Sequence, residues 1–190
     1  MNARNLGNPT GLDTYLSNKA TAMASAARSY ESGDAPRETI AADCTAADLT
    51  GVRRVRIRDF QLISDSGPGF GGFGLGPSSP ELLLGMLASC LTHTYLIGAA
   101  QRGVSLDAVH VRFEAENNDA AFLGLDTTDP PYPFNIRAIV RIESRADARE
   151  IADLHDYAAR TCPLTKLVRE PQSIEVRTLS GADETGDRQR

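Results

Sequence analysis

Two cysteines stand in sequence settings that bear on thiol chemistry. Cys162 precedes Pro163 at the end of an amphipathic pattern, and the apolar residues that follow predict a further helical turn. Such a helix start favours a thiolate, because free backbone N–H groups and the helix dipole stabilise negative charge. Cys90 lies inside a long apolar stretch, where a lone cysteine is in the first place a buried, inert thiol.

Two further residues offer alternative chemistry. His93 follows Cys90 by three positions, so the two side chains border each other on one helix face. A cysteine nucleophile with a histidine base would perform acyl transfer. This alternative is weak, because adjacency on one helix does not aim the imidazole at the sulfur. Cys44 lies in an alternating segment beside Ile40 and Ala46, and we expect it to be a small core or interface residue.

A cluster of arginines occupies a predicted strand over residues 52–63. The apolar register shifts within this segment, which predicts a β-bulge near Arg58 and Asp59. The arginines predict a solvated face whose aliphatic stems pack on the sheet. A sharper hypothesis is that one of them points into a cleft and holds a thiolate or a peroxide oxygen. The cluster comprises Arg53, Arg54, Arg56 and Arg58.

Residues 78–103 predict one long helix that carries Cys90. Ser78 and Glu81 have capping-box spacing, and Gly103 suits the left-handed position after a helix end. Apolar side chains cover all sides between these ends, as in a helix that is buried all round. A membrane span is the alternative, but polar residues dilute the stretch and no positive cluster flanks it. We therefore expect the central helix of a soluble core, shared with a second subunit.

The remaining patterns predict an α+β domain with an antiparallel sheet. Alternating apolar residues predict strands, and helical periodicity predicts the flanking helices. The chain divides into a helical N-terminal arm at 1–36, one domain at 37–178 and a polar, disordered tail at 179–190. The expected elements are helices over 12–31 and 147–161, and strands over 38–46, 52–63, 106–116, 134–144 and 173–178.

Composition limits the classes of function. The chain has 190 residues, and its net charge of −5 gives no reason to expect nucleic-acid binding. Its start lacks an apolar signal-peptide core, and three cysteines do not make a secreted disulfide scaffold, so we expect a cytoplasmic location. No cysteine or histidine pair has zinc-ligand spacing, so no metal is expected. The GxGxxG at residues 69–74 does not open directly onto a helix, which excludes a dinucleotide site.

The cysteine motifs occur in a characteristic order. A Gly-Pro-x-Ser-Pro-Glu-Leu-Leu-Leu start at residues 76–84 leads into Leu-Ala-Ser-Cys-Leu-Thr at 87–92. Gly103 ends this helix, strands follow, and a second helix ends in Cys-Pro-Leu at 162–164. In this order the motifs resemble the OsmC/Ohr family (osmotically inducible protein C and organic hydroperoxide resistance protein). The resemblance covers residues 37–177.

The resemblance implies an α+β, OsmC-like fold in which two subunits intertwine and antiparallel sheets wrap around central Cys-bearing helices. It implies a cofactor-free peroxidase that reduces organic hydroperoxides in oxidative-stress defence. By this resemblance Cys90 is the peroxidatic cysteine, Cys162 is the resolving cysteine, and a Cys90 sulfenic acid precedes a disulfide between them. The implied partners are a second copy of the chain, a small organic hydroperoxide and an external dithiol, which a lipoylated protein can supply; no membrane partner is implied.

The sequence departs from the family pattern in the groups that organise the thiolate. Arg53 or Arg54 matches the family's arginine by position after a turn, and the sequence does not choose between them. The loop at 66–76 has no glutamate where the best-known members carry one. A non-catalytic OsmC-fold protein that binds a small apolar ligand at the subunit interface is therefore the alternative function.

Overall fold

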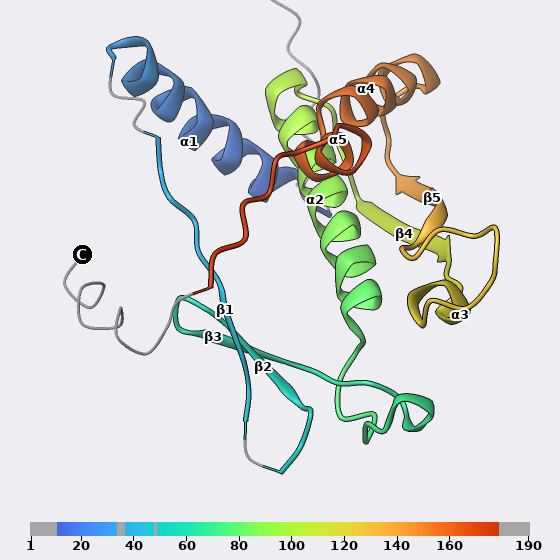
Figure 1. Cartoon of the computed structure of the whole chain (residues 1–190). Helices are drawn as coiled ribbons and strands as arrows, with labels where there is room; N and C mark the ends of the chain where they lie inside the picture. Colours follow the sequence, from blue (N-terminus) through green and yellow to red (C-terminus); the bar gives the residue numbers. More distant parts are fainter. Residues whose placement is uncertain (1–10, 34–36, 48, 179–190) are drawn as a thin grey trace, which may run out of the picture.

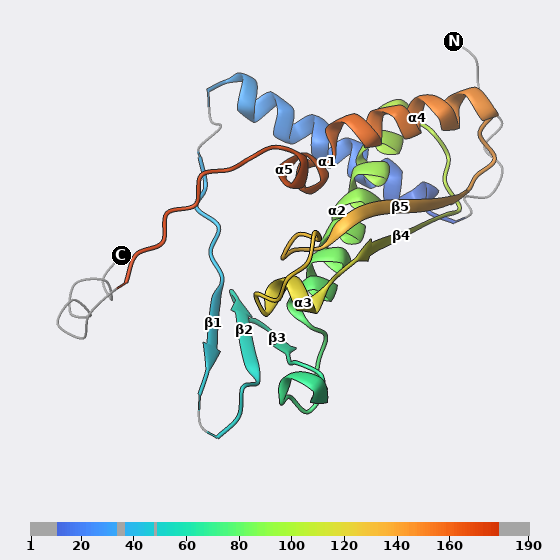
Figure 2. The same cartoon turned by 45° about the vertical axis from the view of Figure 1, so that its right-hand side comes forward.

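The computed structural model describes residues 11–33, 37–47 and 49–178, and it has an α+β architecture arranged around one helix (Figures 1 and 2). The predicted tail at 179–190 lies outside the described residues, as do residues 1–10 and 34–36 of the predicted N-terminal arm. The elements in chain order are α1 (Asp13–Glu31), β1 (Asp43–Ala46), β2 (Arg53–Ile57), β3 (Phe60–Ser64), the 3₁₀-helix η1 (Pro68–Phe70), α2 (Ser79–Arg102), β4 (Ala108–Glu116), α3 (Asp119–Phe122), β5 (Phe134–Glu143), α4 (Ala148–Thr161) and α5 (Pro163–Arg169).

Helix α2 confirms the predicted central element and both of its ends. Ser78 is the N-cap, and the Glu81 carboxylate accepts a hydrogen bond from the Ser78 backbone N–H at 2.7 Å. Gly103 ends the helix in the left-handed conformation at φ 66°, which glycine adopts without the steric cost of a Cβ. The hydroxyl of Ser78 donates to the same Glu81 oxygen, and these bonds lower the pKa of Glu81.

Helix α2 also holds the core together. It contacts α1, β4, α4 and α5. By length and composition it is the one helix in the described residues that is apolar enough to cross a membrane. Only 33% of its most apolar stretch is buried in the single chain, so the prediction of a helix buried on all sides is wrong for one copy of the chain. The buried core around it comprises Leu16, Leu91, Tyr95, Ala99, Ala100, Val104, Leu106, Leu154, Ala158 and Cys162.

The strands form two separate antiparallel sheets. The order is β1-β2-β3 in one and β4-β5 in the other. The β4–β5 pair packs against α2, whereas the β1–β3 sheet lies beyond the N-terminal end of α2 (Figures 1 and 2). In β4, Val109, Val111 and Phe113 are half-buried and His110 is exposed, as in a strand with one face packed against the core.

The predicted single strand over residues 52–63 is wrong. The segment is a hairpin, in which β2 and β3 pair across a turn at Arg58 and Asp59. The shift of apolar register therefore marks a reversal of the chain and not a bulge. Arg58 takes a positive φ of 53° in this turn, and no glycine at that position signalled a tight turn in the sequence.

Two other strand predictions need correction. Strand β1 begins only at Asp43, and Ile40 and Cys44 are exposed, so Cys44 is not a core residue of this chain. Residues 173–178 form no strand, and Ile174 and Val176 are exposed. In both segments apolar side chains alternate as in a strand, but the described part of this chain provides no layer that would cover them.

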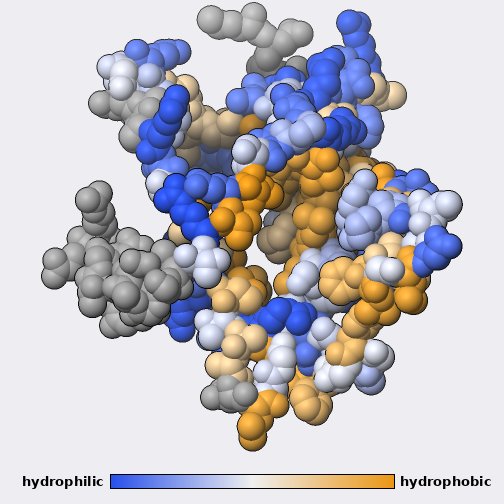
Figure 3. All heavy atoms as spheres, viewed as in Figure 1, coloured by the Kyte–Doolittle hydropathy of each residue, from blue (hydrophilic) through white to orange (hydrophobic). Residues whose placement is uncertain are grey.

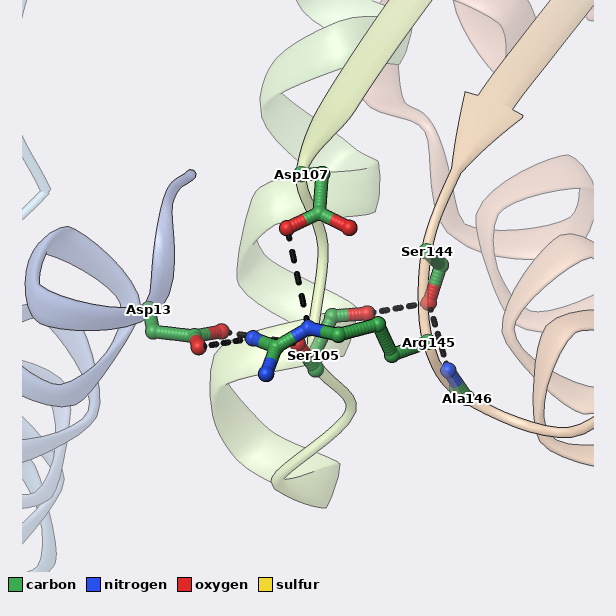
Figure 4. A network of polar contacts seen from close by, with 6 residues as sticks. All are labelled: Asp13, Ser105, Asp107, Ser144, Arg145 and Ala146. Carbon is green, nitrogen blue, oxygen red and sulfur yellow. Dashed lines mark hydrogen bonds and ion pairs between the residues drawn. The ribbon is translucent and has the colours of Figure 1, made fainter. Parts of the chain in front are cut away.

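Helix α1 packs on α2 through buried Leu16 and is fixed at its start by polar contacts (Figure 4). The Asp13 carboxylate accepts hydrogen bonds from the Ser105 hydroxyl, at 2.8 Å, and from the Arg145 guanidinium. The Leu12 backbone N–H donates to the Leu106 carbonyl at 3.0 Å. These contacts attach the predicted N-terminal helix to the rest of the domain.

Candidate functional site

The structure brings the two predicted redox cysteines together. Cys90 lies in α2, and Cys162 lies between α4 and α5, where Pro163 ends one helix and begins the next. Their Sγ atoms are 3.7 Å apart, and both thiols are free. This separation allows a hydrogen bond between the sulfurs and leaves only a short movement to a covalent bond of about 2.05 Å.

Cys162 has the more polar surroundings of the two sulfurs. Its side chain is completely buried, which by itself raises the pKa of the thiol because an apolar interior disfavours charge. Hydrogen bonds to the sulfur outweigh this effect. The Thr165 hydroxyl donates at 3.2 Å, and with contributions from the Thr165 backbone, Cys90 and Thr94 it lowers the pKa of Cys162 below its ordinary value.

Cys90 shows the opposite behaviour. Burial is the main influence and raises the pKa of Cys90, and the adjacent Cys162 raises it further. The Leu164 backbone N–H opposes these effects only in part. In the contact between the two sulfurs, the Cys162 thiol is the donor and the Cys90 sulfur is the acceptor.

A largely apolar cavity of about 330 Å³ lies on the far side of Thr165 from the Cys162 sulfur, and neither cysteine is among the residues that line it. Leu87, Leu91 and Tyr95 of α2 line one side, and Phe113 and Val140 of the β4–β5 sheet line another. Thr165 lines it too, so the hydroxyl that contacts the Cys162 sulfur also forms part of the cavity wall. The cavity suits the apolar body of a small organic molecule.

A tyrosine–histidine contact lies in the cavity wall. The Tyr95 hydroxyl is 2.5 Å from the His155 Nδ1. Burial raises the pKa of Tyr95 to about 12, so the phenol stays protonated at neutral pH. His155 is exposed overall, and its hydrogen-bond partner lies 60 positions away in the sequence.

His93 faces the N-terminal helix. Its Nε2 lies 2.9 Å from the Lys19 Nζ of α1. Burial lowers the pKa of His93, and the positive charge of Lys19 lowers it further. This contact directs the imidazole to α1, which argues against the Cys90–His93 acyl-transfer hypothesis.

The two candidate arginines lie in the β1–β3 sheet. The Arg53 guanidinium donates to the Ser64 hydroxyl at 3.2 Å and to the Ser66 hydroxyl at 3.5 Å. Its Nε is buried without a hydrogen-bond acceptor among the described residues. Arg54 is exposed on the other face of the strand, in a hollow that Asp43 and Gln61 also line. The hydrogen bonds of the Arg53 guanidinium thus lead to serines and not to a cysteine.

Asp65 is a buried carboxylate that sequence reasoning missed. It accepts hydrogen bonds from the backbone N–H groups of Ser66, Phe73 and Leu75. The Leu75 bond is the largest influence on Asp65 and lowers its pKa, which burial opposes. Gly72 lies against the Ser66 carbonyl, where a Cβ would come within 2.0 Å. The glycine-rich loop is therefore folded around this carboxylate. An acidic residue directly before a glycine-rich loop is the signal that could have indicated it.

Comparisons with known proteins agree with this architecture. The sequence profile of the family described as OsmC-like protein matches residues 72–177. No curated protein matches the chain. Among solved structures, an OsmC-like protein from Mycoplasma pneumoniae is 16% identical with a TM-score of 0.58, and the match covers 70% of this chain and 89% of that one.

Two further structures have similar folds. An organic hydroperoxide resistance protein OsmC from Legionella pneumophila is 18% identical, with a TM-score of 0.52 and coverage of 70% and 91%. An organic hydroperoxide resistance protein from Elizabethkingia anophelis is 14% identical, with a TM-score of 0.53 and coverage of 71% and 91%. These likenesses confirm the predicted OsmC-like fold. Together with the profile match over more than half of its length, they show that the chain belongs to the OsmC-like family.

Proposed function

We propose that this protein is a thiol-dependent peroxidase that reduces organic hydroperoxides through Cys90 and Cys162. The observation that carries the proposal is the 3.7 Å contact between two free thiols near an apolar cavity. Membership of a family that includes organic hydroperoxide resistance proteins supports the same chemistry. The cavity would hold the alkyl group, and the partly accessible Cys90 would meet the peroxide.

The proposed reaction has three steps. The Cys90 thiolate attacks the terminal oxygen of the hydroperoxide, the O–O bond breaks, and the alkoxide leaves and takes up a proton as the alcohol. The Cys162 thiolate then attacks the sulfur of the Cys90 sulfenic acid, and a disulfide forms as hydroxide leaves. An external dithiol returns the disulfide to two thiols and becomes a disulfide itself. A lipoylated protein is the proposed source of that dithiol.

A second copy of the chain is part of the proposal. Only 33% of the most apolar stretch of α2 is buried in the single chain, and Figure 3 shows apolar atoms on the middle of one face, over α2. The exposed apolar residues include Leu83 and Met86 of α2 and Phe60 and Leu62 of β3. An intertwined homodimer would cover these surfaces, and sedimentation equilibrium would detect it.

Arg53 is the proposed arginine for the activation of Cys90. Its unsatisfied buried Nε is a donor available to an anion, whereas the Arg54 side chain lies on the exposed face. In the dimer, the β1–β3 sheet of one subunit would bring Arg53 to the cysteines of the other. A nearby guanidinium favours the thiolate and would offset the burial that raises the pKa of Cys90.

The decisive test is a thiol count after addition of cumene hydroperoxide. One equivalent should consume the Cys90 and Cys162 thiols together and leave Cys44, as peptide mass spectrometry would show. Cys90→Ser should abolish the consumption of peroxide, while Cys44→Ser should not change it. Survival of both thiols in the wild-type protein would exclude this mechanism.

A second candidate function is the binding of a small apolar ligand without turnover. The raised pKa of Cys90 and the engagement of Arg53 by serines favour it. The pH dependence of peroxide consumption separates the two functions, with Arg53→Ala and Arg54→Ala as a matched pair. If Arg53 activates Cys90, the rate of peroxide consumption should reach half of its maximum below pH 9. Arg53→Ala should raise the pH of half-maximal rate, and Arg54→Ala should not. The binding function would be favoured if the wild-type protein consumes no peroxide and the Cys90→Ser variant still binds apolar probes.

A further inference from the structure

The hydrogen bonds around the two sulfurs run in one direction. The Thr165 hydroxyl donates to the Cys162 sulfur at 3.2 Å, and the Cys162 thiol donates to the Cys90 sulfur over 3.7 Å. A thiol is a weak donor, and a charged acceptor strengthens such a bond. The series of donors ends at Cys90, which agrees with Cys90 as the attacking thiolate of the proposed function.

Cys162 holds its proton in a place that water does not reach. Its side chain has no exposed surface, whereas Cys90 is partly exposed. Buried Thr94 stands one turn from Cys90, but its hydroxyl donates to the Cys90 carbonyl at 2.9 Å, and a hydroxyl has only one proton to donate. Among the residues that the structure describes, Cys162 is therefore the side chain that directs a proton to the Cys90 sulfur.

The other candidate proton donors of the site have their hydrogen-bonding contacts elsewhere. The His93 Nε2 lies 2.9 Å from the Lys19 Nζ, and the Tyr95 hydroxyl lies 2.5 Å from the His155 Nδ1. Both contacts lead away from the two sulfurs. The Arg53 guanidinium keeps its protons at neutral pH, so it can support a thiolate but cannot act as an acid.

The charge on Cys90 controls when Cys162 can lose its proton. Two thiolates 3.7 Å apart in a buried site would repel each other, so Cys162 stays protonated while Cys90 is charged. Attack on the peroxide converts Cys90 into a neutral sulfenic acid. The repulsion then ends, and Cys162 can release its proton at the step in which the departing alkoxide needs one.

We propose that the Cys162 thiol is the acid that protonates the departing alkoxide, in addition to its role as the resolving cysteine. This inference rests on the proposed function and deepens it. The Cys90 thiolate attacks the terminal oxygen, the O–O bond breaks with its electron pair on the alkoxide, and the Cys162 proton moves to that oxygen to give the alcohol. The resulting Cys162 thiolate attacks the Cys90 sulfur, and the S–O bond breaks as hydroxide leaves and takes up a proton from solvent.

One proton transfer thereby prepares the second step. A disulfide forms by attack of a thiolate and not of a thiol. Because Cys162 gives its proton to the alkoxide, it becomes the nucleophile at the step in which Cys90 becomes the electrophilic sulfenic acid. No separate base has to reach the buried Cys162 sulfur.

The test measures the first step alone, in Cys162→Ala and Cys162→Ser. Neither variant can close the disulfide, so a single turnover is followed by release of cumyl alcohol and by dimedone trapping of the Cys90 sulfenic acid. With cumene hydroperoxide both variants should react about a hundredfold more slowly than the wild type, a typical loss when a general acid is removed. Cys44→Ser is the control, since Cys44 is an exposed thiol outside the pair.

Peroxybenzoic acid distinguishes an acid from a residue that only supports the site. Its leaving group is a carboxylate, whose conjugate acid has a pKa of about 4, so its departure needs no proton at neutral pH. The Cys162 variants should therefore react with peroxybenzoic acid as fast as the wild type. Cys162→Ser, which nearly preserves the volume of the side chain, covers the case in which alanine disturbs the packing.

Two results would overturn the inference while the proposed function stands. Unchanged rates with cumene hydroperoxide would show that Cys162 supplies no proton. Equal slowing with both oxidants would show that Cys162 only supports the structure of the site. If the wild-type protein forms no Cys90 sulfenic acid with either oxidant, the proposed function is wrong and the inference falls with it.

Discussion

The two ends of α2 differ in how completely one chain surrounds them. Around Cys90 and Tyr95 the helix is packed by α1, α4, α5 and the β4–β5 sheet, and Cys162 and Leu154 have no exposed surface. At its start, Leu83 and Met86 are exposed, and the neighbouring β1–β3 sheet carries exposed Phe60. The two cysteines thus meet within one chain, whereas the arginine-bearing β1–β3 sheet presents apolar surface to solvent (Figure 3).

This contrast indicates which parts of the site are local and which are not. The meeting of the cysteines depends on contacts within one subunit, so it should persist whatever the state of assembly. The proposed activation of Cys90 by Arg53 would depend on the β1–β3 sheet, at the end of the molecule that one chain leaves exposed. Substitutions at the two ends should therefore respond differently to dilution of the protein.

The largest difference in the free energy of unfolding is expected between Leu154 of α4, which packs in the core, and Leu62 of the β1–β3 sheet. Leu154→Ala removes a fully buried side chain and should reduce the free energy of unfolding by about 2–5 kcal/mol. Leu62→Ala, at a side chain 38% exposed, should cost less than about 1 kcal/mol if the chain is monomeric. Urea denaturation at two protein concentrations measures both. A larger, concentration-dependent cost at Leu62 would show that a second copy covers it.

Two glycines of α2 provide a smaller, matched comparison. A Cβ on Gly98 would come within 2.6 Å of the Tyr157 ring and 2.8 Å of Leu154, so Gly98→Ala should destabilise by about 1–3 kcal/mol. Gly85 has nothing within 4 Å of that position. Gly85→Ala should therefore stabilise by up to about 1 kcal/mol through helix propensity. Thermal denaturation should show a lower melting temperature for Gly98→Ala and a higher one for Gly85→Ala. If Gly85→Ala lowers the melting temperature, another group, such as a second copy of the chain, packs against Gly85.

The Asp65 loop predicts a dependence of stability on pH. Backbone N–H bonds depress the pKa of Asp65 below 3.8 in the folded state, so its stabilising contribution is present above 3.8 and disappears as pH falls through the folded value. Asp65→Asn should accordingly be less stable than wild type at pH 7, and the two should converge in stronger acid. Urea titrations at both pH values test this. A constant difference between the two proteins would mean that the charge of Asp65 is unimportant.

The smallest effect is expected for the attachment of α1. Arg145 is half-exposed and pairs with Asp13 (Figure 4), and exposed ion pairs contribute about 0–1 kcal/mol. Arg145→Ala should therefore change the global stability by less than about 1 kcal/mol, yet increase hydrogen exchange in α1 while α2 stays protected. Arg141→Ala, on the exposed side of β5, is the control. Equal exchange in α1 for both variants would contradict the proposed role of this pair.

Local patterns were sufficient where the signal lies within one element. The boundaries of α2 follow from Ser78, Glu81 and Gly103, and the break between α4 and α5 follows from Pro163. The prediction of one strand over residues 52–63 was wrong because the chain turns at Arg58, which takes a positive φ although it is not a glycine. The prediction of a strand at residues 173–178 was wrong because alternating apolar side chains indicate only that a segment can pair. Pairing also needs a neighbouring strand.

By itself the sequence determined the main helices and their caps, because caps, proline and apolar periodicity act over a few neighbouring residues. The pairing of Cys90 with Cys162 was implied by the resemblance to the OsmC/Ohr family. Only the tertiary structure decided that the Cys90 and Cys162 sulfurs lie 3.7 Å apart and that Thr165 donates to one of them. It also decided that Arg53 binds serines and that Asp65 organises the loop. Ionisation depends on burial and on donors within a few ångströms, and these come from segments far apart in the chain.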